Sequence, residues 1–302
     1  MPLIELHWQQ AAVLAAASAA AGLLLRLVQA RRSAPRSAPP RRRWLSVLAS
    51  ALVEVSVVLG LFTVWQLAGA WALTRVAGAF QRAHWILAAE HRVGLPSELT
   101  AQQVVLDHPD LIRFLNTFYL YVHINSIVVF LVWMFWRHRD RYRWARNTLV
   151  LTTGSCLLVQ MIPVAPPRML PDSGFVDLAL QYGQSIYGAF GSGVADQLSA
   201  LPSVHVAWAL LIAFFVLEVS TSRWRWLVLL HPVATIFVVV ATANHYWADG
   251  IAAGLLLALA LPVTDALERR RARRPTPAAQ PTLEEPVVDV LPGSLSGARL
   301  PT

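Results

Sequence analysis

Long apolar runs alternate along this chain with short clusters of basic residues. Seven of the runs approach the about 20 helical residues needed to cross the hydrocarbon core of a bilayer. Their approximate bounds are Trp8–Val28, Leu45–Trp65, Phe118–Trp136, Leu149–Pro163, Val204–Val219, Trp226–Val240 and Tyr246–Leu261. The pattern therefore predicts an all-α fold, a polytopic membrane helix bundle of about seven transmembrane helices.

The composition agrees with this pattern. Hydrophobic residues make up 56% of the 302 residues and charged residues 14%, with a mean hydropathy of +0.50. Ordinary soluble domains are more polar than this, so the bilayer is the expected solvent. The single cysteine, Cys156, lies in an apolar run, which excludes an intramolecular disulfide and a cysteine metal cage.

The basic clusters predict how the chain is oriented in its membrane. With seven crossings they all fall on one side, and short cytoplasmic loops are the ones enriched in Lys and Arg. The clusters are Arg31–Arg43, Arg137–Arg146, Arg223–Arg225 and Arg269–Arg274. The net charge of +8 could suggest nucleic acid, but its clustering beside apolar runs favours membrane topology and no nucleic-acid partner.

Three parts of the chain are distinguished by composition. Residues 1–43 form an N-terminal transmembrane helix with a basic cytoplasmic link, 44–264 a membrane-embedded domain, and 265–302 a disordered, proline-rich cytoplasmic tail. The first run lacks the basic start of a cleaved signal peptide, which favours a retained helix. Gln66–Thr117 should not span; interfacial helices beginning with Ala70–Ala89 or a plain connecting segment both fit.

Polar residues that lipid alone does not explain gather in three segments. These are Ala165–Arg168, Leu201–His205 and Asn244–Asp249. In the predicted topology the fourth run ends, the fifth begins, and the sixth and seventh meet on the same side, outside the cytoplasm. The three segments are therefore expected to form one site there.

The third segment contains a possible catalytic dyad. His245 and Asp249 are four residues apart, so on a helix both project from one face. Asp249 could accept the proton of one ring nitrogen and leave the other free to attack phosphorus. Catalysis would then pass through a phosphohistidine.

The other two segments offer phosphate-binding groups. Pro202 favours a helix start, whose free N–H groups and dipole bind phosphate oxygens, and Ser203 adds a hydroxyl. His205 could protonate the leaving oxygen. Arg168 follows two prolines at the membrane surface, and its planar guanidinium suits bidentate contact with phosphate.

Each of these elements also has a structural interpretation. They could be a plain helix start, an interfacial polar pair and a headgroup anchor. Their occurrence together on one side favours catalysis, because ionisable groups at membrane depth cost about 2.5–3.5 kcal/mol each.

At these residues the chain resembles the type 2 phosphatidic acid phosphatase superfamily over about Phe114–Leu261. Arg168 is similar to the end of the first family motif, Pro202–His205 to the second, and His245–Asp249 to the third. The resemblance implies a six-helix core in which His245 is the nucleophile and Asp249 its partner. It further implies that His205 is the general acid and that Arg168 binds phosphate.

Two positions depart from the family pattern. Met161 stands where the first motif usually begins with lysine, and Val239 where the third motif usually has arginine. These losses resemble the branch of fungal inositol phosphorylceramide synthase and its bacterial relatives. Candidates to replace the two cations are Asn116, Tyr119, His123 and Asn244. Interhelical hydrogen bonding is an equally good explanation for the first three.

The sequence thus predicts a cell-membrane enzyme with its site outside the cytoplasm, needing no metal or cofactor. Its expected substrate is a phospholipid or polyprenyl phosphate, and its reaction hydrolysis or phosphotransfer, including transfer of a phosphoinositol-type headgroup. Rival hypotheses are a zinc hydrolase using His205, His245 and Asp249, a lipid or anion transporter, and a serine hydrolase using Ser203. No nucleophile elbow supports the last. Oligomeric state is left open.

Overall fold

A computed structural model describes residues 7–31, 40–72, 77–184 and 197–273, and this part of the chain is an all-α bundle. Five helical stretches are long and apolar enough to cross a membrane, which confirms a multi-pass membrane bundle. They are Trp8–Arg31, Trp44–Val64, Pro109–Arg137, Arg223–Ala241 and Trp247–Ala272, with Val204–Val219 as a shorter apolar helix. The predicted count of seven stays a prediction.

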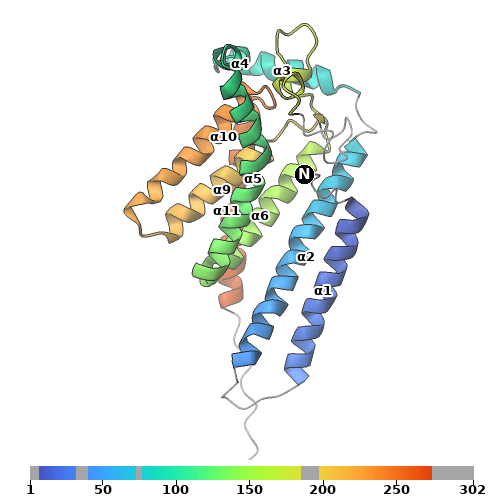
Figure 1. Cartoon of the computed structure of the whole chain (residues 1–302), viewed down its shortest axis with the longest axis vertical. Helices are drawn as coiled ribbons and strands as arrows, with labels where there is room; N and C mark the ends of the chain where they lie inside the picture. Colours follow the sequence, from blue (N-terminus) through green and yellow to red (C-terminus); the bar gives the residue numbers. More distant parts are fainter. Residues whose placement is uncertain (1–6, 32–39, 73–76, 185–196, 274–302) are drawn as a thin grey trace, which may run out of the picture.

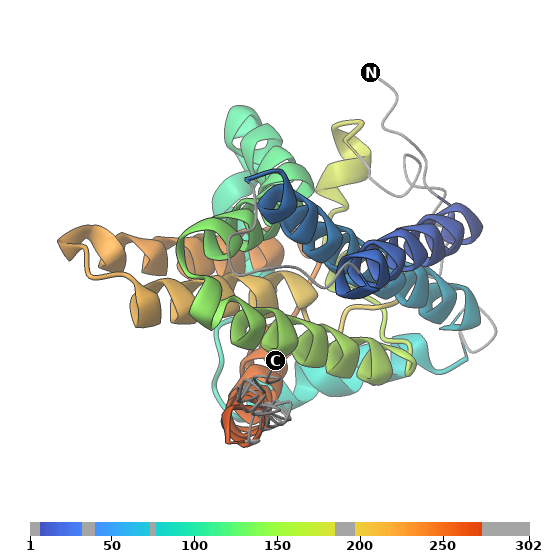
Figure 2. The ribbon, with the colours of Figure 1, turned by 90° about the horizontal axis from the view of Figure 1, so that it is seen from below.

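The first two helices form an antiparallel hairpin. Helix α1 (Trp8–Arg31) lies along α2 (Pro40–Ala72), and the pair flanks the later helices without being enclosed by them (Figures 1 and 2). Gly22 permits their close approach, since a Cβ there would lie 2.9 Å from Val53 Cγ2 and 3.0 Å from the Ala49 carbonyl oxygen. Small residues serve helix packing in membranes in this way.

Five helices make the main bundle: α5 (Pro109–Arg137), α6 (Arg139–Gln160), α9 (Val204–Val219), α10 (Leu230–Ala241) and α11 (Trp247–Ala272). A short 3-10 helix, η4 (Arg223–Leu229), connects α9 to α10. The core between them is filled by large side chains, among them Phe130, Met134, Leu211, Phe215 and Leu257.

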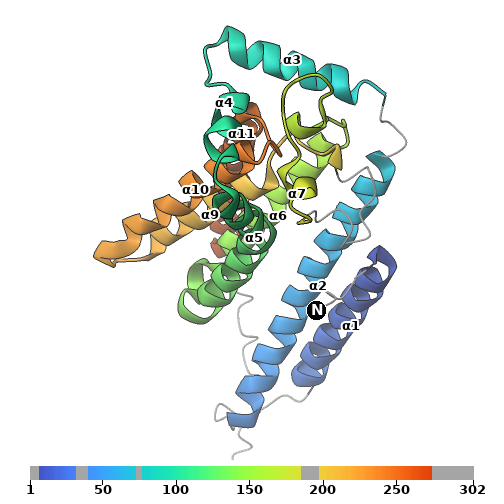
Figure 3. The ribbon, with the colours of Figure 1, turned by 45° about the horizontal axis from the view of Figure 1, so that its top comes forward.

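Two shorter helices, α3 (Ala79–Arg92) and α4 (Glu98–Leu106), lie across one end of the bundle (Figures 1 and 3). We call this end, which also holds the α10–α11 loop, the motif end. The interfacial helix expected over Ala70–Ala89 is two pieces, because α2 runs to Ala72 and α3 begins after Gly78. Gly78 has φ +80°, a conformation that favours glycine.

The surface of α3 suits a membrane interface. Phe80 and Trp85 are exposed on it, whereas Ala79, Ala83 and Glu90 are buried against the bundle. Such a face is typical of helices that lie in the headgroup layer. The interfacial interpretation of this segment stays a prediction, which the exposed aromatic side chains favour over a plain connection.

The opposite end, which holds the α5–α6 connection and the last turn of α11, is here called the arginine end (Figure 1). There Arg146 of α6 pairs with Glu54 of α2, which also accepts a hydrogen bond from Tyr142 Oη at 3.1 Å. Arg146 contacts Asn147 Oδ1 at 2.8 Å, and Asn147 Nδ2 donates to Glu268 of α11 at 2.8 Å. This polar cluster joins three helices.

The predicted domain boundaries remain predictions, with one difference at the tail. Helix α11 continues to Ala272, so residues 265–272 are helical instead of disordered. An ion pair between Asp265 and Arg269, four residues apart, and basic residues in the last turn favour this extension. The rest of the predicted tail, 274–302, lies outside the described residues.

Candidate active site

The loop between α10 and α11 places His245 at the motif end. Ala243 takes a left-handed conformation, φ +53°, just after α10. The backbone N–H groups of Asn244 and His245 both donate to the carbonyl oxygen of Val239, at 3.0 and 3.1 Å. This tight turn brings His245, a buried side chain, directly in front of α11.

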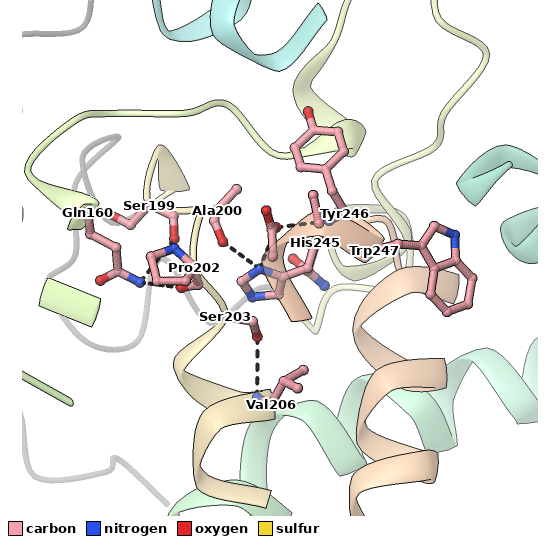
Figure 4. A network of polar contacts seen from close by, with 12 residues as sticks. Gln160, Ser199, Ala200, Pro202, Ser203, Val206, His245, Tyr246 and Trp247 are labelled. Atoms are coloured by element: carbon pink, nitrogen blue, oxygen red, sulfur yellow. Dashed lines mark hydrogen bonds and ion pairs between the residues drawn. The ribbon is translucent and has the colours of Figure 1, made fainter. Parts of the chain in front are cut away.

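The hydrogen bonds of His245 determine which ring nitrogen carries its proton. Its Nδ1 lies 3.0 Å from Asp249 Oδ2 and 2.8 Å from the carbonyl oxygen of Ala200 (Figure 4). The carbonyl oxygen of Ala200 can only accept, so Nδ1 is the protonated nitrogen and Nε2 keeps its lone pair. The contact expected from the four-residue spacing is present, while its catalytic role stays a prediction.

Burial keeps this imidazole neutral. It lowers the pKa of His245 from 6.5 to about 4, against the opposing hydrogen bond to Ala200 and with a smaller contribution from the positive charge of Arg168. At neutral pH an uncharged Nε2 is therefore available as a nucleophile.

The second segment, Leu201–His205, leads into α9 and lies beside the imidazole of His245. Ser203, not Pro202, caps the helix: its Oγ accepts from Val206 N–H at 3.4 Å (Figure 4). One of the donors expected to bind phosphate is therefore already satisfied. His205 lies in the first turn, and its ring centroid is 5.7 Å from that of His245.

Arg168 is held by neighbours from two directions. It lies in the 3-10 helix η2 (Pro167–Met169), with its side chain 1% exposed. Its Nε donates to Asn244 Oδ1 at 2.8 Å, and a terminal nitrogen lies 3.1 Å from Asp177 Oδ2. The structure thus brings Arg168, Asn244 and His245 together, as the sequence predicts.

Backbone pairing ties the three segments to one another. Val164 N–H donates to Leu198 O at 2.7 Å, and Ala200 N–H donates to Val164 O at 3.3 Å. Tyr246 Oη donates to the carbonyl oxygen of Ala165 at 2.7 Å. Three stretches far apart in sequence therefore form one rigid polar unit.

The comparisons with known proteins agree with this geometry. A family model described as the PAP2 superfamily matches residues 84–263, more than half of the chain and all three segments. The chain belongs to the PAP2 superfamily. Neither the comparison with curated proteins nor that with solved structures gives a match. PAP2 proteins are phosphatases or phosphotransferases, so the resemblance found in the motifs is confirmed at the level of the superfamily.

The candidate substitutes for the missing PAP2 cations differ in their surroundings. The rings of Tyr119 and His123 each lie 4.6 Å from that of His205, measured between centroids. Asn116 instead donates to Leu178 O at 3.2 Å and to Gln184 Oε1 at 3.1 Å, so both amide hydrogens are used in joining α5 to the segment around α7 (Leu178–Gln181). Its contacts fit the packing explanation.

Three acidic residues near this PAP2 site were not predicted from the sequence. Asp177 pairs with Arg168, as described above. Glu90 of α3 and Glu98 of α4 are buried against the start of α11. The only signal for Glu90 is its register: it falls eleven residues after Ala79 and seven after Ala83, on the buried face of α3. Nothing in the sequence distinguishes Asp177 or Glu98.

The zinc hypothesis receives no support from the donor geometry. In the part of the chain that the structure describes, no group of three or more His, Cys, Asp or Glu side chains is arranged to hold a metal ion. The Nδ1 of His245 is already bonded to Asp249 and Ala200. Chelation experiments, described below, address the hypothesis directly.

Proposed function

We propose that this protein is a lipid phosphate phosphatase or phosphotransferase that works through a phosphohistidine on His245. The observation that carries the proposal is the buried Nδ1 of His245, hydrogen-bonded to Asp249 and Ala200. This arrangement leaves a neutral Nε2 on an imidazole whose neighbour is a second imidazole, His205.

In the first step, Nε2 of His245 attacks phosphorus and the bond from phosphorus to the leaving oxygen breaks. His205, protonated in the presence of the phosphate's negative charge, gives its proton to that oxygen and becomes neutral, while Asp249 stabilises the positive charge that develops on His245. Arg168 and the first turn of α9 supply positive charge for the phosphoryl oxygens. In its resting state Arg168 is satisfied by Asp177 and Asn244.

In the second step, a hydroxyl attacks phosphorus and the bond to Nε2 breaks. His205 now accepts the proton of the incoming hydroxyl, which returns His205 to its protonated form and His245 to its neutral form. Water as the attacking group makes the protein a phosphatase, and a lipid or polyol hydroxyl makes it a phosphotransferase. The mechanism requires neither a metal nor a cofactor.

A lipid substrate is supported by the position of the site. The three segments lie at the motif end, and the amphipathic helix α3 contacts two of them (Figure 3). The basic residues at the ends of α1, α5 and α11 support a cytoplasmic arginine end. We therefore place the site outside the cytoplasm in the cell membrane, acting on a phospholipid or polyprenyl phosphate.

Phosphotransfer is the more specific version of the proposal. Met161 and Val239 replace the two usual cations, as in the branch of inositol phosphorylceramide synthase and its bacterial relatives. His245, Asp249 and Ser203 are buried, which limits contact between bulk water and a phosphohistidine. The first feature favours a polyol acceptor, such as one that yields a phosphoinositol-type headgroup.

The test is a substrate panel with purified full-length protein in nanodiscs. Phosphatidate, a polyprenyl diphosphate and a phosphoinositide are each supplied with and without inositol, before and after EDTA treatment. We expect phosphate release or headgroup transfer that survives EDTA, and no turnover by His245→Ala. The matched control is His138→Ala, a histidine at the arginine end, which should turn over like wild type.

Two outcomes would overturn the proposal. Activity that EDTA abolishes and zinc restores would replace the phosphohistidine with metal chemistry. No turnover on any lipid, together with normal function of His245→Ala in cells, would favour a transporter that uses the polar site to hold an anion.

A further inference from the structure

The start of α11 is surrounded by three carboxylates. Asp249 Oδ2 accepts from the N–H of Tyr246 at 2.9 Å, within the same helix start. Glu90 Oε1 accepts from the N–H of Ala248 at 2.6 Å, and Glu98 Oε1 lies 3.5 Å from the N–H of Trp247. Helices α3 and α4 thus satisfy two of the N–H groups that a helix start leaves without partners.

Burying these acids is costly unless the protein uses them. Glu90 is 4% exposed and Glu98 3% exposed. The positive end of the α11 dipole stabilises nearby negative charge, but two neighbouring carboxylates do not both ionise readily. The acid–base groups that act on Glu90 from the elements packed against it are Glu98 of α4 and Asp249 of α11.

Together these effects favour a proton on Glu90. Burial, the hydrogen bond with Glu98 and the negative charges of Glu98 and Asp249 raise the pKa of Glu90 to about 8, against the opposing N–H of Ala248. At neutral pH Glu90 therefore keeps its proton. Loss of that proton would place a buried negative charge next to Glu98 and Asp249.

The same helix also touches the first motif segment. Arg82 of α3 donates from Nε to Pro163 O at 2.7 Å, and Ala165 N–H lies 3.3 Å from Ala79 O. Helix α3 therefore contacts both the loop that carries Arg168 and the helix start that carries Asp249.

We propose that Glu90 and Glu98 are positioning residues, which hold the His245–Asp249 turn in its reactive geometry through the backbone of Trp247 and Ala248. This role rests on the proposed function of His245. The two acids touch no reacting atom; they act through the first turn of α11. In the proposed orientation α3 lies at the membrane surface, so the contact also joins that surface to the active-site turn.

The experiment compares Glu90→Ala, Glu98→Ala and Glu90→Gln in nanodiscs, with Asp110→Asn as the control for an exposed acid on the same end of the bundle. Loss of the acceptor should lower kcat about 10- to 100-fold with little change in KM, because misplacement of a catalytic group affects the transition state. Glu90→Gln keeps an acceptor oxygen and should retain most of the activity at pH 7.

The pH profile separates positioning from a general role in folding. Wild-type turnover should fall above pH about 8 as the proton of Glu90 is lost. Glu90→Gln, which has no such proton, should remain active at higher pH. This measurement remains decisive if the alanine variants fail to fold.

Backbone hydrogen exchange gives a readout that needs no turnover. We expect faster exchange at Trp247–Asp249 in both alanine variants, and no change there in Asp110→Asn. Unchanged exchange and an unchanged pH profile would overturn the positioning role even if wild type is active. Absence of wild-type turnover would count against the proposed function, while faster exchange would still support the contact.

Discussion

The two ends of the bundle each hold a polar cluster, partly buried at the arginine end and buried at the motif end, and the clusters differ in how completely their groups are paired. At the arginine end, Arg146 faces Glu54, and Asn147 connects it to Glu268. At the motif end, both ring nitrogens of His123, Nδ1 of His205 and Oδ1 of Asp249 are buried with no hydrogen-bond partner among the described residues.

This difference indicates a structural role for the cluster at the arginine end and a functional role for the cluster at the motif end. A buried polar atom without a partner costs about 1–3 kcal/mol, so a fold gains nothing by keeping several of them together. Charges of opposite sign that satisfy one another serve to join α2, α6 and α11. The motif end instead keeps polar atoms free at a place where a phosphate and its leaving group could use them.

The largest expected effect is the loss of turnover in His245→Ala and His205→Ala. Each should lower kcat by at least about 10³-fold, because one removes the nucleophile and the other the acid. Single-turnover assays of folded protein measure the change. Substantial turnover by His245→Ala would show that His245 is not the nucleophile. The motif end would then have no demonstrated catalytic role that the arginine end lacks.

Asp249→Asn should lower kcat about 10²- to 10⁴-fold. One oxygen, Oδ2, contacts both His245 Nδ1 and Tyr246 N–H. An asparagine oxygen at that position keeps both contacts but loses the negative charge, and an amide nitrogen there would donate to Nδ1 and move the ring proton to Nε2. The stability of this variant should change little compared with its activity. A rate close to wild type would contradict the proposed tautomer.

Acid should inactivate the protein only well below the usual range for histidine. Since burial lowers the pKa of His245 to about 4, kcat/KM should begin to fall near that pH and not near 6.5. The unfolded chain binds this proton below 6.5, so His245 also makes the free energy of unfolding decrease between pH 6.5 and 4. An acid limb near 6.5 in the wild-type profile would contradict a neutral, buried His245.

Arg146→Leu tests the arginine end. It leaves Glu54 partly buried without its cation, so the free energy of unfolding should fall by about 2 kcal/mol. Turnover per folded molecule should stay within about twofold of wild type. Denaturant titration measures the free energy of unfolding, and an assay of the same preparation measures turnover. A large loss of kcat would show that this cluster contributes to catalysis.

The smallest effect is expected for Tyr246→Phe. The change removes the hydrogen bond from Tyr246 to Ala165 O and should lower the free energy of unfolding by about 1 kcal/mol. Activity should change little, since the hydroxyl bonds to backbone. A loss as large as that of Asp249→Asn would place Tyr246 among the reacting groups.

The sequence predicts those features that depend on local spacing. Runs of apolar residues identify the membrane helices, and the four-residue spacing of His245 and Asp249 puts both on one turn. The start of α3 cannot be predicted from composition. Gly78 interrupts the helix by its backbone conformation, while the residues around it do not change in character. Helical residues after Asp265 were also missed, since arginine-rich composition is compatible with both tail and helix.

Long-range contacts could not be predicted in the same way. The pairs Glu90–Ala248 and Arg168–Asp177 depend on how loops and surface helices pack, and no periodicity in one sequence encodes that. The convergence of three segments was predictable from topology alone. Their backbone pairing through Val164 and Ala200 was not.

The central claim is that His245 carries the phosphoryl group. The most direct test incubates purified wild type and His245→Ala with a lipid labelled at phosphorus, quenches within one turnover and maps the label by peptide. We predict an acid-labile, base-stable label on His245 that the variant lacks. Turnover by wild type with label on another residue, or an equal label in His245→Ala, would contradict the account.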